Sequence, residues 1–114
     1  MNEINPEWEL SVAQVKEMFD RRESFLLLDV REPDEYAICR IDGAHLVPLG
    51  ELAARCEELR TLAADRPIVT QCHHGGRSLN AAILLRKLGF EGVRSMAGGI
   101  NGWSIQIDPA VPRY

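Results

Sequence analysis

The hydrophobic residues of this chain fall into short blocks that alternate between the spacing of strands and the spacing of helices. Residues 25–30 form a nearly continuous apolar run that is too short for a buried helix. Such a run is typical of a parallel strand that is covered on both faces. Residues 68–71 predict a second strand, and weaker blocks at 8–10, 45–47 and 92–96 predict further short strands, the first of them at a sheet edge.

Three stretches between these strands have apolar residues at helical spacing. Ser11 followed by Gln14 is the pattern of a capping box and predicts a helix over about 12–22. A second helix is predicted from apolar positions that share one face, namely Leu49, Leu52, Cys56, Leu59 and Leu62. A third helix, 78–88, is expected to end at Gly89. Strands that alternate with helices predict a parallel sheet with helices on both faces, in which ligands bind at the carboxyl ends of the strands.

Length and composition limit the classes of protein to which this chain can belong. The 114 residues, 46% of them hydrophobic, suffice for a single core, and we expect one domain over residues 1–114. The net charge of −4 argues against nucleic acid or an anionic membrane as a partner, because these need clustered Lys and Arg. No apolar run approaches the roughly 20 residues of a membrane helix, and no leader pattern opens the chain. The three cysteines, an odd number, favour reduced thiols, so we expect a cytoplasmic protein.

The segment with the strongest chemical signal begins at Cys72, directly after the predicted strand 68–71. The predicted helix 78–88 would point its free N–H groups and its positive dipole end back at this cysteine and stabilise negative charge there. We therefore expect a thiolate, the form of cysteine that acts as a nucleophile. A cysteine that only fills a core is the alternative, but a loop of His, Gly and Arg is a poor core wall.

The rest of this loop supplies candidates for binding a substrate beside the sulfur. Gly75 and Gly76 let the loop bend so that successive N–H groups converge on an anion. Arg77 adds a cation whose fork of donors suits a dianionic substrate, with a purely structural ion pair as the alternative. His73 and His74 could add charge or contact a donor, or could simply be solvated.

Four short motifs follow one another along nearly the whole chain. They are Leu28-Asp29-Val30-Arg31-Glu32 with Glu35-Tyr36, Ile41-Asp42-Gly43-Ala44, the loop 72–78, and Gly98-Gly99-Ile100-Asn101-Gly102-Trp103. Together they resemble the rhodanese family of sulfurtransferases. The resemblance implies a rhodanese-like α/β fold with a five-stranded parallel sheet. It also implies that Cys72 is the catalytic cysteine, and that the backbone N–H groups of His73 through Ser78 form its cradle.

In the family, the catalytic cysteine carries a persulfide sulfur from a donor such as thiosulfate to an acceptor such as cyanide or a protein thiol. One position departs from the family pattern. The family often has Gly-His before the Ile-x-Gly-Ala motif, where this chain has Cys39-Arg40, so no role of that histidine carries over. We predict no metal and no other cofactor, because the adjacent residues 72–74 lack the separated ligand pairs of a zinc site.

Two other functions compete with sulfur transfer. Cysteine phosphatases share this fold, but their loop reads Cys-x5-Arg, whereas four residues separate Cys72 from Arg77 here. The shorter loop should leave room for one terminal sulfur rather than for a phosphoryl group under in-line attack. Asp29 and Asp42 are the acids that could serve a phosphatase, and neither is convincing. The second competing function is a binding or regulatory module in which the rhodanese fold has lost its chemistry. The presence of Cys72 argues against it.

The remaining candidate residues have supporting roles. Asp29, Arg31 and Glu35 are predicted to form a hydrogen-bonded network that holds the strand end and its turn, because sulfur transfer to a thiolate needs little acid-base help. Cys39 and Cys56 are interpreted as packing residues, with a resolving thiol at Cys39 as the less favoured alternative.

Overall fold

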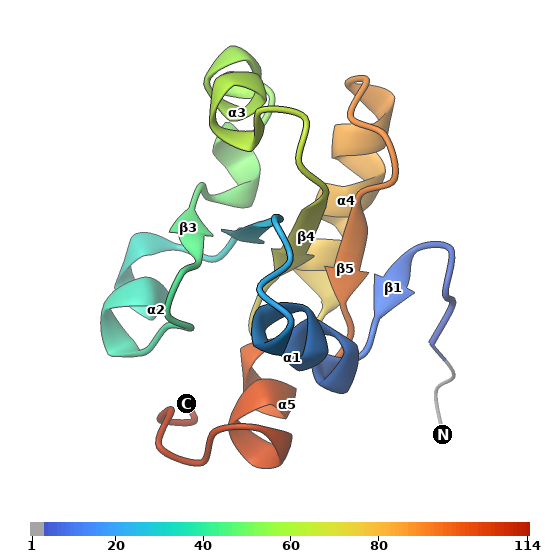
Figure 1. Ribbon diagram of the computed structural model, residues 1–114. Helices are drawn as coiled ribbons and strands as arrows, with labels where there is room; N and C mark the ends of the chain where they lie inside the picture. The colour runs from blue at the N-terminus through green and yellow to red at the C-terminus, as the bar shows by residue number, and fades with distance from the viewer. Residues whose placement is uncertain (1–3) are drawn as a thin grey trace.

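A computed structural model describes residues 4–114 and contains a five-stranded parallel sheet in the order β1-β5-β4-β2-β3 (Figure 1). The strands are β1 (Glu9–Leu10), β2 (Leu26–Asp29), β3 (His45–Leu46), β4 (Ile68–Gln71) and β5 (Arg94–Met96). All four residues of β2 and all four of β4 are buried, as expected for central strands that are covered on both faces. The predicted α/β fold class is confirmed.

Helices cover both faces of this sheet. α3 (Cys56–Ala63) and α4 (Gly76–Lys87) pack on one face, and α1 (Val12–Asp20) and α5 (Gly99–Gln106) pack on the other. Figure 1 shows α1 in front of the strands and α4 behind them. Alternate residues of β2 enter opposite cores: Leu28 joins the cluster with α3 and α4, and Leu27 joins the cluster with α1 and α5. Within residues 4–114, none of the helices combines the length and hydrophobicity that a membrane crossing needs.

All three predicted helices differ from the observed ones in extent. α4 begins two residues before its predicted start. The capping box of Ser11 and Gln14 is present, but α1 ends at Asp20 because Arg22 has a left-handed φ of 55°. The helix expected along 49–62 is divided into a 3₁₀ turn, η1 (Leu49–Glu51), and α3. The Leu49 N–H donates to the Val30 carbonyl. This bond holds the 3₁₀ turn beside the end of β2, apart from α3.

Two helices were not predicted. α2 (Pro33–Ile38) forms where only a turn was expected; Pro33 occupies its first turn, and Glu32 and Glu35 form a capping box. None of its six residues is buried, so the sequence carries no apolar periodicity there. α5 contains two glycines and follows a third, and because glycine lowers helix propensity no helix was predicted there.

Candidate functional site

Cys72 follows β4 directly, and its sulfur lies at the N-terminal end of α4. The backbone N–H groups of Gly75 and Ser78 donate to Sγ at 3.1 Å and 3.3 Å. The Ser78 hydroxyl oxygen lies 3.4 Å from Sγ and 2.7 Å from the hydroxyl of Ser95 on β5. Backbone donors that are aligned with a helix dipole stabilise negative charge on the atom they face. This arrangement can hold an anionic sulfur.

The start of α4 explains why these donors are free. The helix begins at Gly76, two residues before the predicted start, so Ser78 lies in its first turn, where N–H groups have no intrahelical partner. Gly75 precedes the helix with a φ of +114°, and a Cβ there would lie 3.3 Å from the Gly98 nitrogen. The bend that turns the N–H groups toward the sulfur therefore depends on glycine at this position.

The N-terminus of α5 holds the other side of the loop. The Ile100 N–H donates to the Cys72 carbonyl at 2.8 Å, and the Asn101 N–H donates to the His73 carbonyl at 3.0 Å. A Cβ on Gly99 would lie only 2.4 Å from the Cys72 carbonyl oxygen and 2.5 Å from that of His73. The close approach of α5 thus fixes the backbone from which the sulfur is presented.

Arg77, which was predicted to bind an anionic substrate, pairs with Glu35 of α2. Its Nη1 and Nη2 donate to the two carboxylate oxygens at 2.6 Å and 2.9 Å. This bidentate bond, more than any other contact, lowers the pKa of Glu35 to about 2. Two residues that are 42 positions apart in sequence therefore join the loop to α2.

This pair predicts how stability depends on pH. The carboxyl of Glu35 has an ordinary pKa of 4.5 and a lower value in the fold, so the unfolded chain binds the proton more readily. The stabilisation is complete above pH 4.5 and is lost as the pH falls through about 2. Glu35→Gln should cost on the order of 2 kcal/mol near neutral pH, allowing for the partly exposed Arg77, and should flatten the pH dependence.

Urea unfolding of the wild type and of Glu35→Gln between neutral pH and pH 2 measures this. Asp34→Asn, which changes an exposed acid of the same helix, is the matched control. A pH dependence that is identical in Glu35→Gln and the wild type would contradict the assignment.

Asp29 and Arg31 form a second ion pair, with both side chains completely buried. Arg31 Nη2 lies 2.7 Å from Asp29 Oδ2 and also donates to the Cys39 carbonyl at 2.7 Å. Burial disfavours the charged guanidinium, but its hydrogen bonds to Asp29 and Tyr114 raise the pKa of Arg31. Through these bonds the segment after β2 is fixed to both ends of α2, because Arg31 Nη1 also reaches the Glu35 carbonyl at 3.3 Å.

Of the two histidines of the loop, His73 lies against Tyr114 and His74 lies against His73. The His73 ring is 3.8 Å from the Tyr114 ring at an interplanar angle of 5°, and the His74 ring lies 3.9 Å from His73 on a tilted plane. Burial first, and then the neighbouring His74, lower the pKa of His73. We therefore expect a neutral His73 ring, which offers contact and not charge.

Comparison with known proteins identifies the family. The sequence profile of the Rhodanese-like domain matches residues 11–106. The chain belongs to the rhodanese family. It is 34% identical over 104 residues to "Thiosulfate sulfurtransferase GlpE" of Pseudoalteromonas translucida (strain TAC 125), which covers 91% of this chain and 95% of that protein. Among solved structures, the human single-domain sulfurtransferase TSTD1 matches with a TM-score of 0.73 and 28% identity, over 86% of this chain and 96% of that one.

Other rhodanese relatives are longer than this chain. "Putative sulfur carrier protein YrkF" of Bacillus subtilis (strain 168) is 38% identical over 96 residues, which cover 84% of this chain and 50% of that protein. The chain spans between 26% and 50% of the length of several such curated relatives. Rhodanese-like domains therefore occur both alone and within larger proteins, and sulfurtransferases are found among the relatives of this chain.

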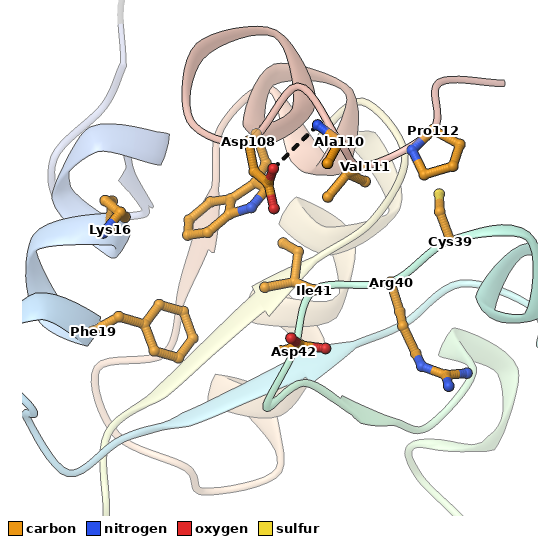
Figure 2. A pocket seen from close by; sticks show the side chains of 11 residues that line it. Lys16, Phe19, Cys39, Arg40, Ile41, Asp42, Asp108, Ala110, Val111 and Pro112 are labelled. Atoms are coloured by element: carbon orange, nitrogen blue, oxygen red, sulfur yellow. Dashed lines mark hydrogen bonds between the residues drawn. The ribbon is translucent and has the colours of Figure 1, made fainter.

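The position where this rhodanese departs from the family motif borders a cavity. Cys39 and Arg40 line a cavity of about 390 Å³ together with residues of α1, α5 and the segment after α5 (Figure 2). Figure 2 shows the Cys39 sulfur directed toward Pro112. None of the residues that line this cavity comes from the loop 72–78, and Cys72 itself is only 1% exposed. This cavity therefore does not give a substrate direct contact with the sulfur.

Three residues of the site were not singled out as functional from the sequence. Ser95 lies on β5, and its hydroxyl meets that of Ser78, but a lone serine in a strand gives no signal. Gly99 belongs to one of the rhodanese motifs, yet only the structure shows its approach to the Cys72 carbonyl. Tyr114 is distant in sequence from the loop, and no pattern links the two.

Proposed function

We propose that this rhodanese is a thiosulfate sulfurtransferase. Sulfane sulfur would pass from thiosulfate or a persulfide donor to a thiophilic acceptor, cyanide or a thiol, through a persulfide on Cys72. The observation that carries the proposal is the position of Cys72 Sγ against the N–H groups of Gly75 and Ser78. The same donors and the dipole of α4 would stabilise the terminal sulfur of a persulfide anion between the two half-reactions.

The two half-reactions balance without an external oxidant or reductant. In the first, the Cys72 thiolate attacks the outer sulfur of thiosulfate, a sulfur–sulfur bond forms, and sulfite leaves with the electron pair of the broken bond. In the second, cyanide attacks the outer sulfur of the persulfide, thiocyanate leaves, and the thiolate returns. A thiol acceptor would take the sulfur in the same way and become a persulfide.

The other loop residues would bind the donor. All of these residues follow Cys72 within one short loop. We assign this role to the backbone N–H groups near the sulfur and to three side chains, namely Gly75, Gly76 and Ser78 for the backbone and His73, His74 and Arg77 for the side chains. Asp29, Arg31 and Glu35 would hold that loop in position through the two ion pairs.

Phosphate hydrolysis is less well supported. The loop has four residues between Cys72 and Arg77, whereas cysteine phosphatases have five. The shorter loop would leave too little room for a tetrahedral phosphoryl group under in-line attack. A role as a purely regulatory module is disfavoured because the cysteine is present at the helix terminus.

The proposed setting of the reaction follows from the relatives and the cysteines. YrkF is named a putative sulfur carrier, and we propose that this chain likewise gives sulfur to a thiol or a protein acceptor. We propose a single rhodanese-like domain over residues 1–114 that works in the cytoplasm, where its three free cysteines would stay reduced. Nucleic acid and membranes are not among the proposed partners.

Steady-state kinetics test the proposed function. With one thiol to store the sulfur, sulfite should leave before cyanide enters, so the mechanism should be ping-pong. Initial rates at varied thiosulfate and cyanide should then give parallel double-reciprocal lines. Intersecting lines would indicate a ternary complex in place of the persulfide intermediate. An absence of turnover with every sulfur donor would refute the proposed function.

The pairing of Arg77 with Glu35 gives a second test, in which two variants should act in opposite directions. Arg77→Ala should raise KM for thiosulfate about tenfold and change use of a neutral persulfide donor much less, because a charged donor bond is lost. Glu35→Gln leaves the Arg77 cation unneutralised and should lower KM for thiosulfate. Equal losses with both donors, in both variants, would assign the pair to loop structure alone.

A further inference from the structure

The segment after α5 returns to the Cys72 loop along a defined path. The Ser104 hydroxyl of α5 donates to the Val111 carbonyl at 2.6 Å, and the Val111 N–H donates to the Asp108 carbonyl at 3.0 Å. Val111 also packs against the core that contains Trp103. Figure 2 shows Val111 and Pro112 on the wall of the cavity that Cys39 borders. These contacts fix the path of the chain from α5 to Tyr114, which lies beside the Cys72 loop.

Tyr114 contacts that loop directly at His73 and is linked to Arg77 through Glu35. Its ring lies flat on the His73 ring, 3.8 Å away, and His73 follows Cys72 directly. Its hydroxyl donates to Glu35 Oε2 at 2.7 Å, and the same carboxylate holds Arg77 at the far end of the loop. The hydroxyl also accepts from Arg31 Nη1 at 2.9 Å. One side chain therefore joins His73 directly, and Arg77 through Glu35, to the fixed segment after β2.

In this arrangement the sulfur is closed off. Cys72 is 1% exposed, so a donor or acceptor reaches Sγ only after neighbouring groups move. α5 binds the loop backbone through the Cys72 and His73 carbonyls. Tyr114, which is itself 39% exposed, holds the His73 ring directly and the Arg77 side chain through Glu35. Contacts made by a partly exposed side chain open more readily than the backbone hydrogen bonds from α5.

We propose that Tyr114 is a positioning residue that acts as a latch: it holds the Cys72 loop closed, and its release admits sulfur donors and acceptors. This inference rests on the proposed function of Cys72, but the experiment that tests it does not require sulfur transfer. Burial, with the hydrogen bond to Glu35, raises the pKa of Tyr114 to about 12 against the opposing effect of Arg31. The phenol consequently stays protonated and keeps its bond to Glu35 throughout the physiological range.

The test is the rate at which thiol reagents modify Cys72, read at peptide level by mass spectrometry. Iodoacetamide and a bulky aryl maleimide provide two sizes of probe. Tyr114→Ala should accelerate modification of Cys72 about tenfold, and more for the maleimide, because opening becomes easier. Tyr114→Phe keeps the ring stack and loses both hydroxyl bonds, so its rate should lie between those of the wild type and Tyr114→Ala. Arg113→Ala, an exposed neighbour on the same segment, should match the wild type.

Cys56, on α3 and outside the Cys72 loop, is the internal reference for unfolding. Unchanged Cys72 rates in Tyr114→Ala, or equal acceleration in Arg113→Ala, would overturn the latch. If Tyr114→Ala accelerates Cys56 as much as Cys72, Tyr114→Phe decides: selective acceleration of Cys72 supports the latch, and none overturns it. A wild type that lacks sulfur transfer but shows this selective effect would refute the proposed function and leave the latch standing.

Discussion

Replacing Cys72 by serine is expected to reduce sulfur transfer from thiosulfate to cyanide by at least about a thousandfold. A hydroxyl cannot form a persulfide, and it is a far weaker nucleophile at neutral pH than a thiolate. The fold should survive, because the serine oxygen can accept the same N–H groups of Gly75 and Ser78 that now face the sulfur. Turnover and the circular dichroism spectrum should be measured on the same preparation.

Cys56→Ser is the matched control for this variant. Cys56 lies on α3, outside the Cys72 loop, and its replacement should leave turnover within about twofold of the wild type. Substantial residual turnover in folded Cys72→Ser would show that another thiol carries the sulfur, and Cys39 would then be the next residue to replace.

Gly99→Ala is expected to cause the largest loss of stability among single-methyl changes near the site. Its Cβ would lie 2.4 Å from the Cys72 carbonyl oxygen, and its φ of +60° already disfavours any side chain. The loop and α5 would have to separate, which weakens the bonds from Ile100 and Asn101 to the loop carbonyls. We expect a loss of roughly 2–4 kcal/mol, together with lower turnover in the molecules that remain folded.

Gly92→Ala separates the steric effect from the backbone effect. Gly92 has a similar φ of +65°, but a Cβ there would meet nothing within 4 Å. Its replacement should cost only about 1 kcal/mol, the ordinary penalty for a side chain in the left-handed region. Urea unfolding of both variants measures the difference, and equal losses would show that α5 does not clamp the loop as tightly as its contacts indicate.

The two central strands, β2 and β4, could be predicted because they are buried on both faces. The apolar run at 25–30 contains β2, and 68–71 coincides with β4, where every position is covered. α2 gave no such signal, since all its residues are at least partly exposed and only its capping pattern marks it. In α5, Gly99 approaches the backbone of the Cys72 loop, and the glycines of this helix also weakened its helical pattern in the sequence.

Whether a feature of the site could be predicted depended on how close its residues are in the sequence. Cys72 at the start of a helix could be predicted because a strand, a glycine loop and a helix are adjacent in sequence. The partner of Arg77 is 42 residues away, and Tyr114 lies 79 residues from Glu35. Contacts at such separations depend on how the strands are ordered in the sheet, and one sequence read alone does not fix that order.

Mass spectrometry of the protein after incubation with thiosulfate tests the central claim most directly. The account predicts one added sulfur atom per chain, located on the peptide that contains Cys72, lost again on treatment with cyanide and absent from Cys72→Ser. Protein that gains no sulfur from thiosulfate or from a persulfide donor, or that gains it on Cys39 or Cys56 while Cys72 stays unmodified, would contradict the claim that Cys72 carries the sulfur.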